Sequence, residues 1–238
     1  MPMHAACKIR VLITLTLAVG LCGCAARAPI SERSATGQVV HAVPAEPGQA
    51  YRVVDSDSLL IVRVYRGGTR VRAGHNHIVA SHDLAGTVYV AKDLPRSSFE
   101  LEVPVAELTV DEAELRAAQG ADFAADVPDS AKEGTRRNML GAAVLDAEHY
   151  PRITVRSENI DVAGNEITTR VEVRIRDQVR SISVPVSFTV SSTELLAEGA
   201  LALKQTDLGL APFTALLGAL AVQDEMQLHF RVVARVQK

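Results

Sequence analysis

The sequence contains no tryptophan, and aromatic residues make up only 4% of its 238 residues. This scarcity argues against a site that stacks bases or sugars on aromatic side chains. The formal net charge is −3, so the basic surface typical of a nucleic-acid-binding protein is absent. No G-x-S-x-G element, Walker loop or dinucleotide fingerprint occurs. Because no activated nucleophile or acid–base pair is identifiable either, the sequence indicates a binding protein without catalytic residues or a cofactor, not an enzyme.

Cysteine is restricted to positions 7, 22 and 24, so the remainder of the chain has neither a disulfide nor thiol chemistry. Two basic residues, Lys8 and Arg10, precede an apolar run over residues 11–23. This run has the size of a signal-peptide core and is short for a membrane span. We therefore expect residues 1–23 to be a signal peptide.

The apolar run ends in Leu21-Cys22-Gly23-Cys24, which resembles the bacterial lipobox. The resemblance implies cleavage after Gly23 and acylation of Cys24, and hence a membrane partner reached through palmitate-type chains. An ordinary secretory leader with incidental cysteines is the alternative. Residues 24–48 are rich in proline and glycine and predict a flexible tether with a reach of roughly 25–30 Å. The expected location is the cell envelope, on the periplasmic side of the outer membrane.

Alternating apolar and polar residues dominate the chain from Tyr51 onward. Such a period of two is typical of strands with one buried face. It occurs in about eight segments: residues 51–54, 59–65, 84–90, 99–105, 153–155, 167–188 as a hairpin, 195–203 and 226–236. The pattern predicts a mainly β fold over residues 49–238, an antiparallel up-and-down barrel or a sandwich.

The hairpin over residues 167–188 has the clearest pattern. A two-residue turn at Asp177-Gln178 would place Val173 opposite Ile182 and Val171 opposite Val184, with Ile167 opposite Phe188 further on. A slip by one residue would bury the arginines instead, so we expect one face to be strongly specified.

Helices are predicted in one interruption of the strands. Residues 111–129 are acidic and alanine-rich, with a helix in their first part. Ser130 and Glu133 have the spacing of a capping box, so a second helix should run from there to about Leu140 and end at Gly141. A second interruption, residues 207–222, is apolar but broken by glycine and proline. It predicts either a flap over one end of the barrel or a plain strand connection with a short helical turn.

Several motifs together resemble the YceI-like family, which is lipocalin-like. They are Tyr51-Arg-Val-Val-Asp55 with Ser58, Gly74 followed by a polar stretch to Gly86, Arg137-Asn-Met-Leu140 through Asp146-Ala-Glu-His-Tyr150-Pro151 to Ser157, and Lys204-Gln-Thr-Asp207-Leu-Gly209. The resemblance covers residues 49–238. It implies an extended antiparallel barrel whose apolar lumen holds an isoprenoid chain, in a periplasmic protein. The sequence departs from the family pattern at Asn138 and Met139, where Asp and His are common, and at Leu145, where an aromatic residue is common.

The aliphatic inward face suits an apolar lipid ligand, because burying each methylene group gains roughly 0.8 kcal/mol. The candidate lumen residues are Ile167, Val171, Val173, Val184, Val186, Phe188, Leu228 and Phe230. The same alternation is satisfied by a barrel whose side chains fill its interior, so both the hollow and the filled form are open at this stage.

Polar residues cluster at Gly74-His75-Asn76-His77, with His82 close behind. In a strand, His75 and His77 would lie on the same side and could share a metal ion if His82, Asp83 or His149 supplied a third ligand. The alternative is a polar rim or a contact with a ligand headgroup, in which we include His75, Asn76, His77, His82 and Arg136. Arg136, with Lys132 and Arg137 on the same predicted helix, could meet a pyrophosphate; a solvated helix face that pairs with Glu133 is the other interpretation.

Three functions are therefore compatible with the sequence: a lipid-anchored carrier of an isoprenoid or similar lipid, a metal-binding protein that uses His75 and His77, and a structural or assembly lipoprotein with a filled barrel. Protein partners are not identifiable from the sequence.

Overall fold

The structure is a computed structural model that describes residues 48–236. The expected signal peptide, the acylated Cys24 and all but the last residue of the tether lie outside this range. Thirteen strands and two α-helices are present within it: β1 Gln49–Val53, β2 Leu59–Gly67, β3 His77–Ser81, β4 Ala85–Val90, β5 Ser98–Pro104, β6 Thr109–Val110, α1 Ala113–Ala117, α2 Asp129–Leu140, β7 Arg152–Ala163, β8 Glu166–Ile175, β9 Gln178–Pro185, β10 Ser187–Val190, β11 Glu194–Lys204, β12 Thr214–Ala215 and β13 Leu220–Val236. No helix in this range is long and apolar enough to cross a bilayer.

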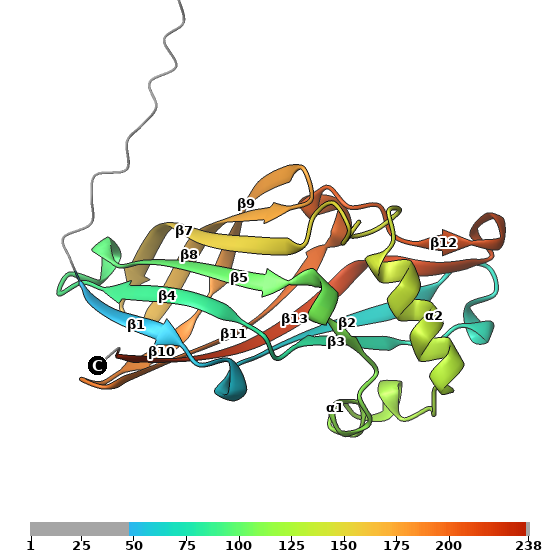
Figure 1. Cartoon of the computed structure of the whole chain (residues 1–238), viewed down its shortest axis with the longest axis horizontal. Helices are drawn as coiled ribbons and strands as arrows, with labels where there is room; N and C mark the ends of the chain where they lie inside the picture. Colours follow the sequence, from blue (N-terminus) through green and yellow to red (C-terminus); the bar gives the residue numbers. More distant parts are fainter. Residues whose placement is uncertain (1–47, 237–238) are drawn as a thin grey trace, which may run out of the picture. The chain divides into compact units, whose positions relative to one another are not determined.

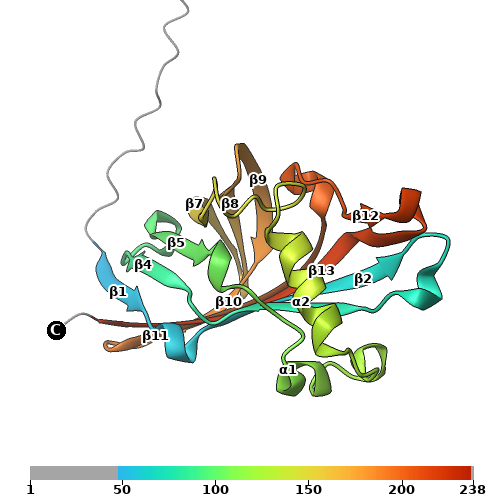
Figure 2. The ribbon, with the colours of Figure 1, turned by 45° about the vertical axis from the view of Figure 1, so that its right-hand side comes forward.

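All strands pair antiparallel in one curved sheet, with the order β6-β3-β2-β13-β1-β4-β5-β7-β8-β9 (Figures 1 and 2). Strand β13 organises this sheet because it is seventeen residues long and pairs with four others. One edge of β13 pairs with β11, while β2 and β1 follow one another along its other edge and β12 pairs with its beginning. The predicted mainly β, antiparallel fold class is thus confirmed.

Hydrogen bonds do not close the sheet into a ring. Strand β9 pairs with β8 as far as Pro185, and the amide of Val186 still donates to Ile167 O (3.0 Å). From Ser187 onward the chain pairs instead with β11, as strand β10. Pro185 has no N–H to donate, so a change of partner at this point leaves no donor unpaired. The bent β9–β10 segment therefore connects the two flanks of the sheet through the covalent chain. The break between β9 and β10, the short strands β6 and β12, and strand β3, which none of the predicted segments covers, explain why about eight predicted strands become thirteen.

The β8–β9 hairpin confirms the predicted inward face but corrects its register. Val171 lies opposite Ile182 and Thr169 opposite Val184, which shifts the predicted pairing by two residues. The turn is formed by Arg176 and Asp177, with Arg176 in the left-handed region (φ 54°). A shift of two residues keeps every side chain on its face, so the alternation itself could not distinguish the two registers.

Both predicted helices are present in this part of the chain, α1 in the acidic segment and α2 ending directly before Gly141. The predicted capping box is wrong: the N-cap of α2 is Pro128, two residues before Ser130, and this N-terminus has no side-chain cap. Proline before the first turn has a fixed φ that already suits the start of a helix, so Ser130 lies inside the first turn. The segment 207–222 is a strand connection that includes β12 and short 3-10 turns at residues 205–208 and 216–218.

Candidate functional site

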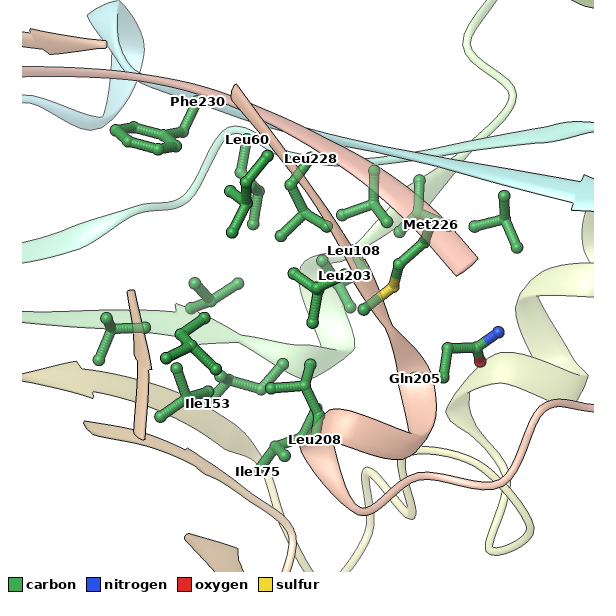
Figure 3. A pocket seen from close by; sticks show the side chains of 18 of the residues that line it. Leu60, Leu108, Ile153, Ile175, Leu203, Gln205, Leu208, Met226, Leu228 and Phe230 are labelled. Atoms are coloured by element: carbon green, nitrogen blue, oxygen red, sulfur yellow. The ribbon is translucent and has the colours of Figure 1, made fainter. Parts of the chain in front are cut away.

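A cavity of about 630 Å³ lies within the curved sheet. Figure 3 shows side chains from several strands converging on it, among them Met226, Leu228 and Phe230 of β13. These three alternate along the strand and therefore share its inner face. Most of the lining is aliphatic, and many lining side chains, including Leu60 and Leu228, are only half-buried because the cavity keeps their surface accessible. The structure thus decides for a hollow interior over a filled one.

All eight candidate lumen residues line this cavity: Ile167, Val171, Val173, Val184, Val186, Phe188, Leu228 and Phe230. Contact with a ligand stays a prediction for each of them. Sequence reasoning missed an equally large share of the lining, such as Leu60, Val62 and Val64 of β2. In β2 both faces are apolar, with Leu59 and Ile61 on the other side, so the period of two identifies the inner face only weakly.

Polar side chains gather at the part of the cavity wall formed by α2, the start of β3 and the residues directly before β3. His75, His77, Thr135 and Asn138 all line the cavity there. The imidazole rings of His75 and His77 are 6.2 Å apart between centroids. His77 Nε2 lies 3.4 Å from Thr135 Oγ1 on α2, and His77 Nδ1 lies 2.6 Å from Asp111 Oδ2. The wall therefore presents several hydrogen-bonding groups to one region of a mainly aliphatic space, whose other polar lining residues are Arg66, Ser97, Thr169 and Gln205.

Asp111 is the buried acceptor on which this polar wall rests, and sequence reasoning did not identify it. Arg116 Nη1 donates to Asp111 Oδ1 (2.6 Å), and the amide of Ile78 donates to the same oxygen (2.9 Å). Burial alone would raise the pKa of Asp111, but hydrogen bonds from His77 and the Ile78 amide and the positive partners outweigh it and hold this pKa below its ordinary value. Asp111 is therefore a carboxylate at neutral pH, which orients His77 through Nδ1. No sequence signal distinguishes it, because its partner His77 lies 34 residues away.

The other predicted rim residues do not line the cavity and instead hold loops. Asn76 accepts from the amide of Arg66 and donates to Asp122 O (3.1 and 3.0 Å). His82 pairs with Glu112 (3.0 Å) at an exposed position. Arg136 donates to the carbonyl oxygens of Leu108 (3.1 Å) and Ala106. Arg136 therefore fixes α2 to the segment before β6, and its guanidinium is occupied in doing so.

The metal hypothesis requires a third ligand near His75 and His77. Within residues 48–236 no group of three His, Cys, Asp or Glu side chains has a metal-binding arrangement. Of the residues predicted to help, His82 pairs with Glu112, and His149 pairs with Asp146 (2.9 Å). That hydrogen bond raises the pKa of the exposed His149. His77 Nδ1 already lies within hydrogen-bond distance of Asp111. The arrangement of His75 and His77 therefore fits hydrogen-bonding groups in the cavity wall.

Comparison with known proteins gives a consistent picture. The model of the family described as "YceI-like domain" matches residues 66–234, which is more than half of the chain. Among solved structures, BcnA of Burkholderia cenocepacia matches with a TM-score of 0.56 and 18% identity, over 76% of this chain and 99% of that one. A polyisoprenoid binding domain from Saccharophagus degradans matches with a TM-score of 0.53 and 13% identity, over 79% of this chain and 99% of that one. At these identities the two structures show a shared fold. A comparison with curated proteins found no match.

Proposed function

Because this chain belongs to the YceI-like domain family, we propose that it is a binding protein that holds an isoprenoid or a similar long apolar lipid in its cavity. The observation that carries this proposal is the aliphatic cavity of about 630 Å³ inside the sheet. Its volume lies within the range of roughly 300–1,000 Å³ that is usual for small-molecule sites. The likeness to the polyisoprenoid binding domain from Saccharophagus degradans supports the same ligand class. A carrier needs no reacting group, in keeping with the lack of catalytic motifs in the sequence.

The shape of the cavity favours a chain-like ligand. On β13 its lining extends from Leu220 to Val232, which at about 3.3 Å per residue spans roughly 40 Å. A space of this length and modest volume is narrow, so it suits an extended hydrocarbon better than a compact ring system. Each methylene group that enters it gains roughly 0.8 kcal/mol without any directional contact.

The polar wall gives the ligand an orientation. His75, Thr135 and Asn138 offer donors and acceptors to the polar end of a lipid, while its hydrocarbon part lies along the aliphatic strands. The positions at which this sequence departs from the family pattern, Asn138, Met139 and Leu145, all line the cavity. We therefore expect the headgroup that this protein accepts to differ from that of relatives with Asp, His and an aromatic residue at these positions.

The site of action follows from the N-terminal sequence, outside the residues that the structure describes. The lipobox-like Leu21-Cys22-Gly23-Cys24 supports an acylated Cys24 that anchors the protein to a membrane of the cell envelope, with its domain on the periplasmic side. Mass spectrometry of the N-terminal peptide tests this directly. A peptide that begins at Cys24 with the added mass of acyl chains supports the anchor, and an unmodified N-terminus elsewhere contradicts it.

The lipid is tested by organic extraction and mass spectrometry of residues 48–238, secreted with an unrelated leader and purified without detergent. We expect one lipid class at close to one molecule per protein. Val184→Glu places a charge on the cavity wall and should abolish the bound lipid. Ser183→Glu is the matched control, because Ser183 is the neighbour of Val184 on β9 and its side chain faces solvent. Lipid-free wild-type protein, or equal lipid in both variants, would contradict the proposal.

A further inference from the structure

The tip of the β12–β13 hairpin exposes two leucines in succession. Leu216 is 68% exposed and Leu217 is 109% exposed, the highest values among the large apolar side chains of residues 48–236. Isolated exposed leucines are common on protein surfaces, but two at the end of a projecting hairpin form a small apolar patch. The hairpin tip is defined here as Leu216, Leu217 and Gly218.

The backbone at the hairpin tip is unsuited to leucine. Leu216 and Leu217 both have positive φ (51° and 55°), and Gly218 follows with φ 83°. Side chains with a Cβ rarely adopt this left-handed region, and glycine or asparagine would adopt it with less strain. In water, therefore, neither burial nor local conformation favours leucine at these two positions. An apolar environment outside the chain would favour both.

Three arginines lie beside the hairpin tip. The connection between β2 and β3 packs against the hairpin, since the amide of Arg70 donates to Ala219 O (2.8 Å). Arg70 and Arg72 of this connection are exposed, as is Arg66 near the end of β2, whose guanidinium donates to Gly74 O (2.9 Å). None of the three forms an ion pair with a residue between 48 and 236. The stretches 66–76 and 208–222 contain no Asp or Glu. The small apolar patch at the hairpin tip is thus bordered by arginines that have no acidic partner among the described residues.

The hairpin and the β2–β3 connection also form one end of the cavity. Gly67 and Ala73 on one side, and Ala215 and Leu220 on the other, belong to the cavity lining. Figures 1 and 2 show the two segments next to one another at the end of the sheet opposite β1 and the C-terminus. A partner that covers the hairpin tip therefore meets the end of the cavity.

We propose that the hairpin tip docks on an anionic phospholipid surface, with Leu216 and Leu217 among the acyl chains and the arginines at the headgroups. Apolar side chains flanked by basic ones are the arrangement that binds a membrane interface. Docking places the end of the cavity against the bilayer, where a lipid can enter or leave without crossing water. This last role rests on the proposed function; the docking itself does not.

The absence of tryptophan makes a direct test possible. Full-length Leu217→Trp is mixed with vesicles of phosphatidylethanolamine and phosphatidylglycerol in which part of the lipid carries brominated acyl chains. Bromine quenches an indole only by contact, so we expect about twofold quenching together with a blue shift of the emission. Val162→Trp, at an exposed position on β7, is the control for proximity through the N-terminal anchor, and its fluorescence should not change.

Equal quenching of both indoles, or none at Leu217→Trp, would overturn the proposal. The exposed leucines would then be explained by contact with another protein. Introducing Arg70→Glu and Arg72→Glu into the Leu217→Trp chain should reduce the quenching several-fold on anionic vesicles; unchanged quenching would overturn the role of the arginines. Lipid extraction from the same preparations separates this test from the proposed function. A lipid-free protein whose tip is quenched contradicts the carrier role alone, and a lipid-loaded protein whose tip is not quenched contradicts the docking alone.

Discussion

Asp111 connects β3 to the segment that carries α1 and α2, and its carboxylate is fully buried. It accepts from Arg116, whose guanidinium also donates to the carbonyl oxygens of Asn76 and Ala125 (2.8 and 2.9 Å). Removing one member of a buried ion pair leaves the other charge unpaired, which is more harmful than losing the attraction alone. The integrity of the polar wall therefore depends on this one carboxylate.

We predict that Asp111→Asn lowers the free energy of unfolding by about 3–5 kcal/mol at pH 7, measured by urea denaturation. Asp129→Asn is the matched control. Asp129 also pairs with a cation, Lys132 at 3.1 Å, but its carboxylate is 91% exposed, so its loss should change stability by less than about 1 kcal/mol. Similar small effects of both substitutions would show that Asp111 does not hold the polar wall together.

The same pair of proteins has a defined pH dependence. The pKa of Asp111 is lower in the folded protein than its ordinary value, so the folded state favours the carboxylate. Its contribution is fully present above the unfolded pKa of about 4 and is lost as the pH falls through the lower folded pKa. The stability difference between wild type and Asp111→Asn should therefore narrow below about pH 4; a difference that widens in acid would contradict this assignment.

Single residues differ in how far their role could be predicted. The eight lumen residues were identified because alternation is a local property of a strand. Asp111, Thr135 and the partners of Arg136 were not, because their contacts join segments that the chain brings together only after folding. Asn76 and His82 were grouped with the rim from their proximity in sequence, but each of them contacts a different loop.

At the scale of elements, helix α2 contains a glycine that lowers its stability and that no neighbouring residue requires. Gly134 lies in the middle of α2, and a Cβ added there would contact nothing within 4 Å. Gly134→Ala should therefore raise the free energy of unfolding by about 0.5–1 kcal/mol, because alanine loses less backbone entropy in a helix. Thermal or urea denaturation measures this gain.

Gly199→Ala is the counterpart in β11 and should have the opposite sign. A Cβ at this position would overlap the ring of Phe230 and the carbonyl oxygen of Pro185. We expect a loss of about 1–3 kcal/mol, since the backbone at Pro185 cannot yield easily. Stabilisation by both substitutions would show that the space beside Gly199 adapts, and that Phe230 is not fixed in the cavity wall by the glycine opposite it.

Strand register is the element-scale property that the sequence predicted wrongly. Alternation determined which face of β8 and β9 points inward, but the pairing moved by two residues because Arg176 adopts a left-handed conformation in the turn. The inner face, and hence the set of cavity residues, is unchanged by such a shift. Cavity-lining residues of β8 and β9 can therefore be predicted even where the hydrogen-bond pairing cannot.

For the whole molecule, the decisive property is the volume that the inner faces leave between them. Each strand contributes an apolar face whether the interior is filled or hollow, so no single segment carries the answer. The sum of side-chain sizes on the inner face of the whole sheet decides it, together with the curvature of the sheet. Aliphatic side chains dominate here: valine and leucine are the two commonest residues in the lining, and Phe99, Phe188, Phe213 and Phe230 are its only phenylalanines.

A cavity of this kind makes stability depend on its ligand. A ligand that binds only the folded protein adds RT ln(1 + [L]/Kd), about 2.7 kcal/mol at a hundredfold excess over Kd. Delipidated residues 48–238 should therefore unfold at a lower temperature than the protein as purified, and adding back the extracted lipid should restore the difference. Ser183→Glu should respond like the wild type and Val184→Glu should not, because only the second substitution changes the cavity wall. An unfolding temperature that is the same with and without lipid would mean that the lipid does not stabilise the folded protein. The proposal that the cavity binds this lipid would then be contradicted.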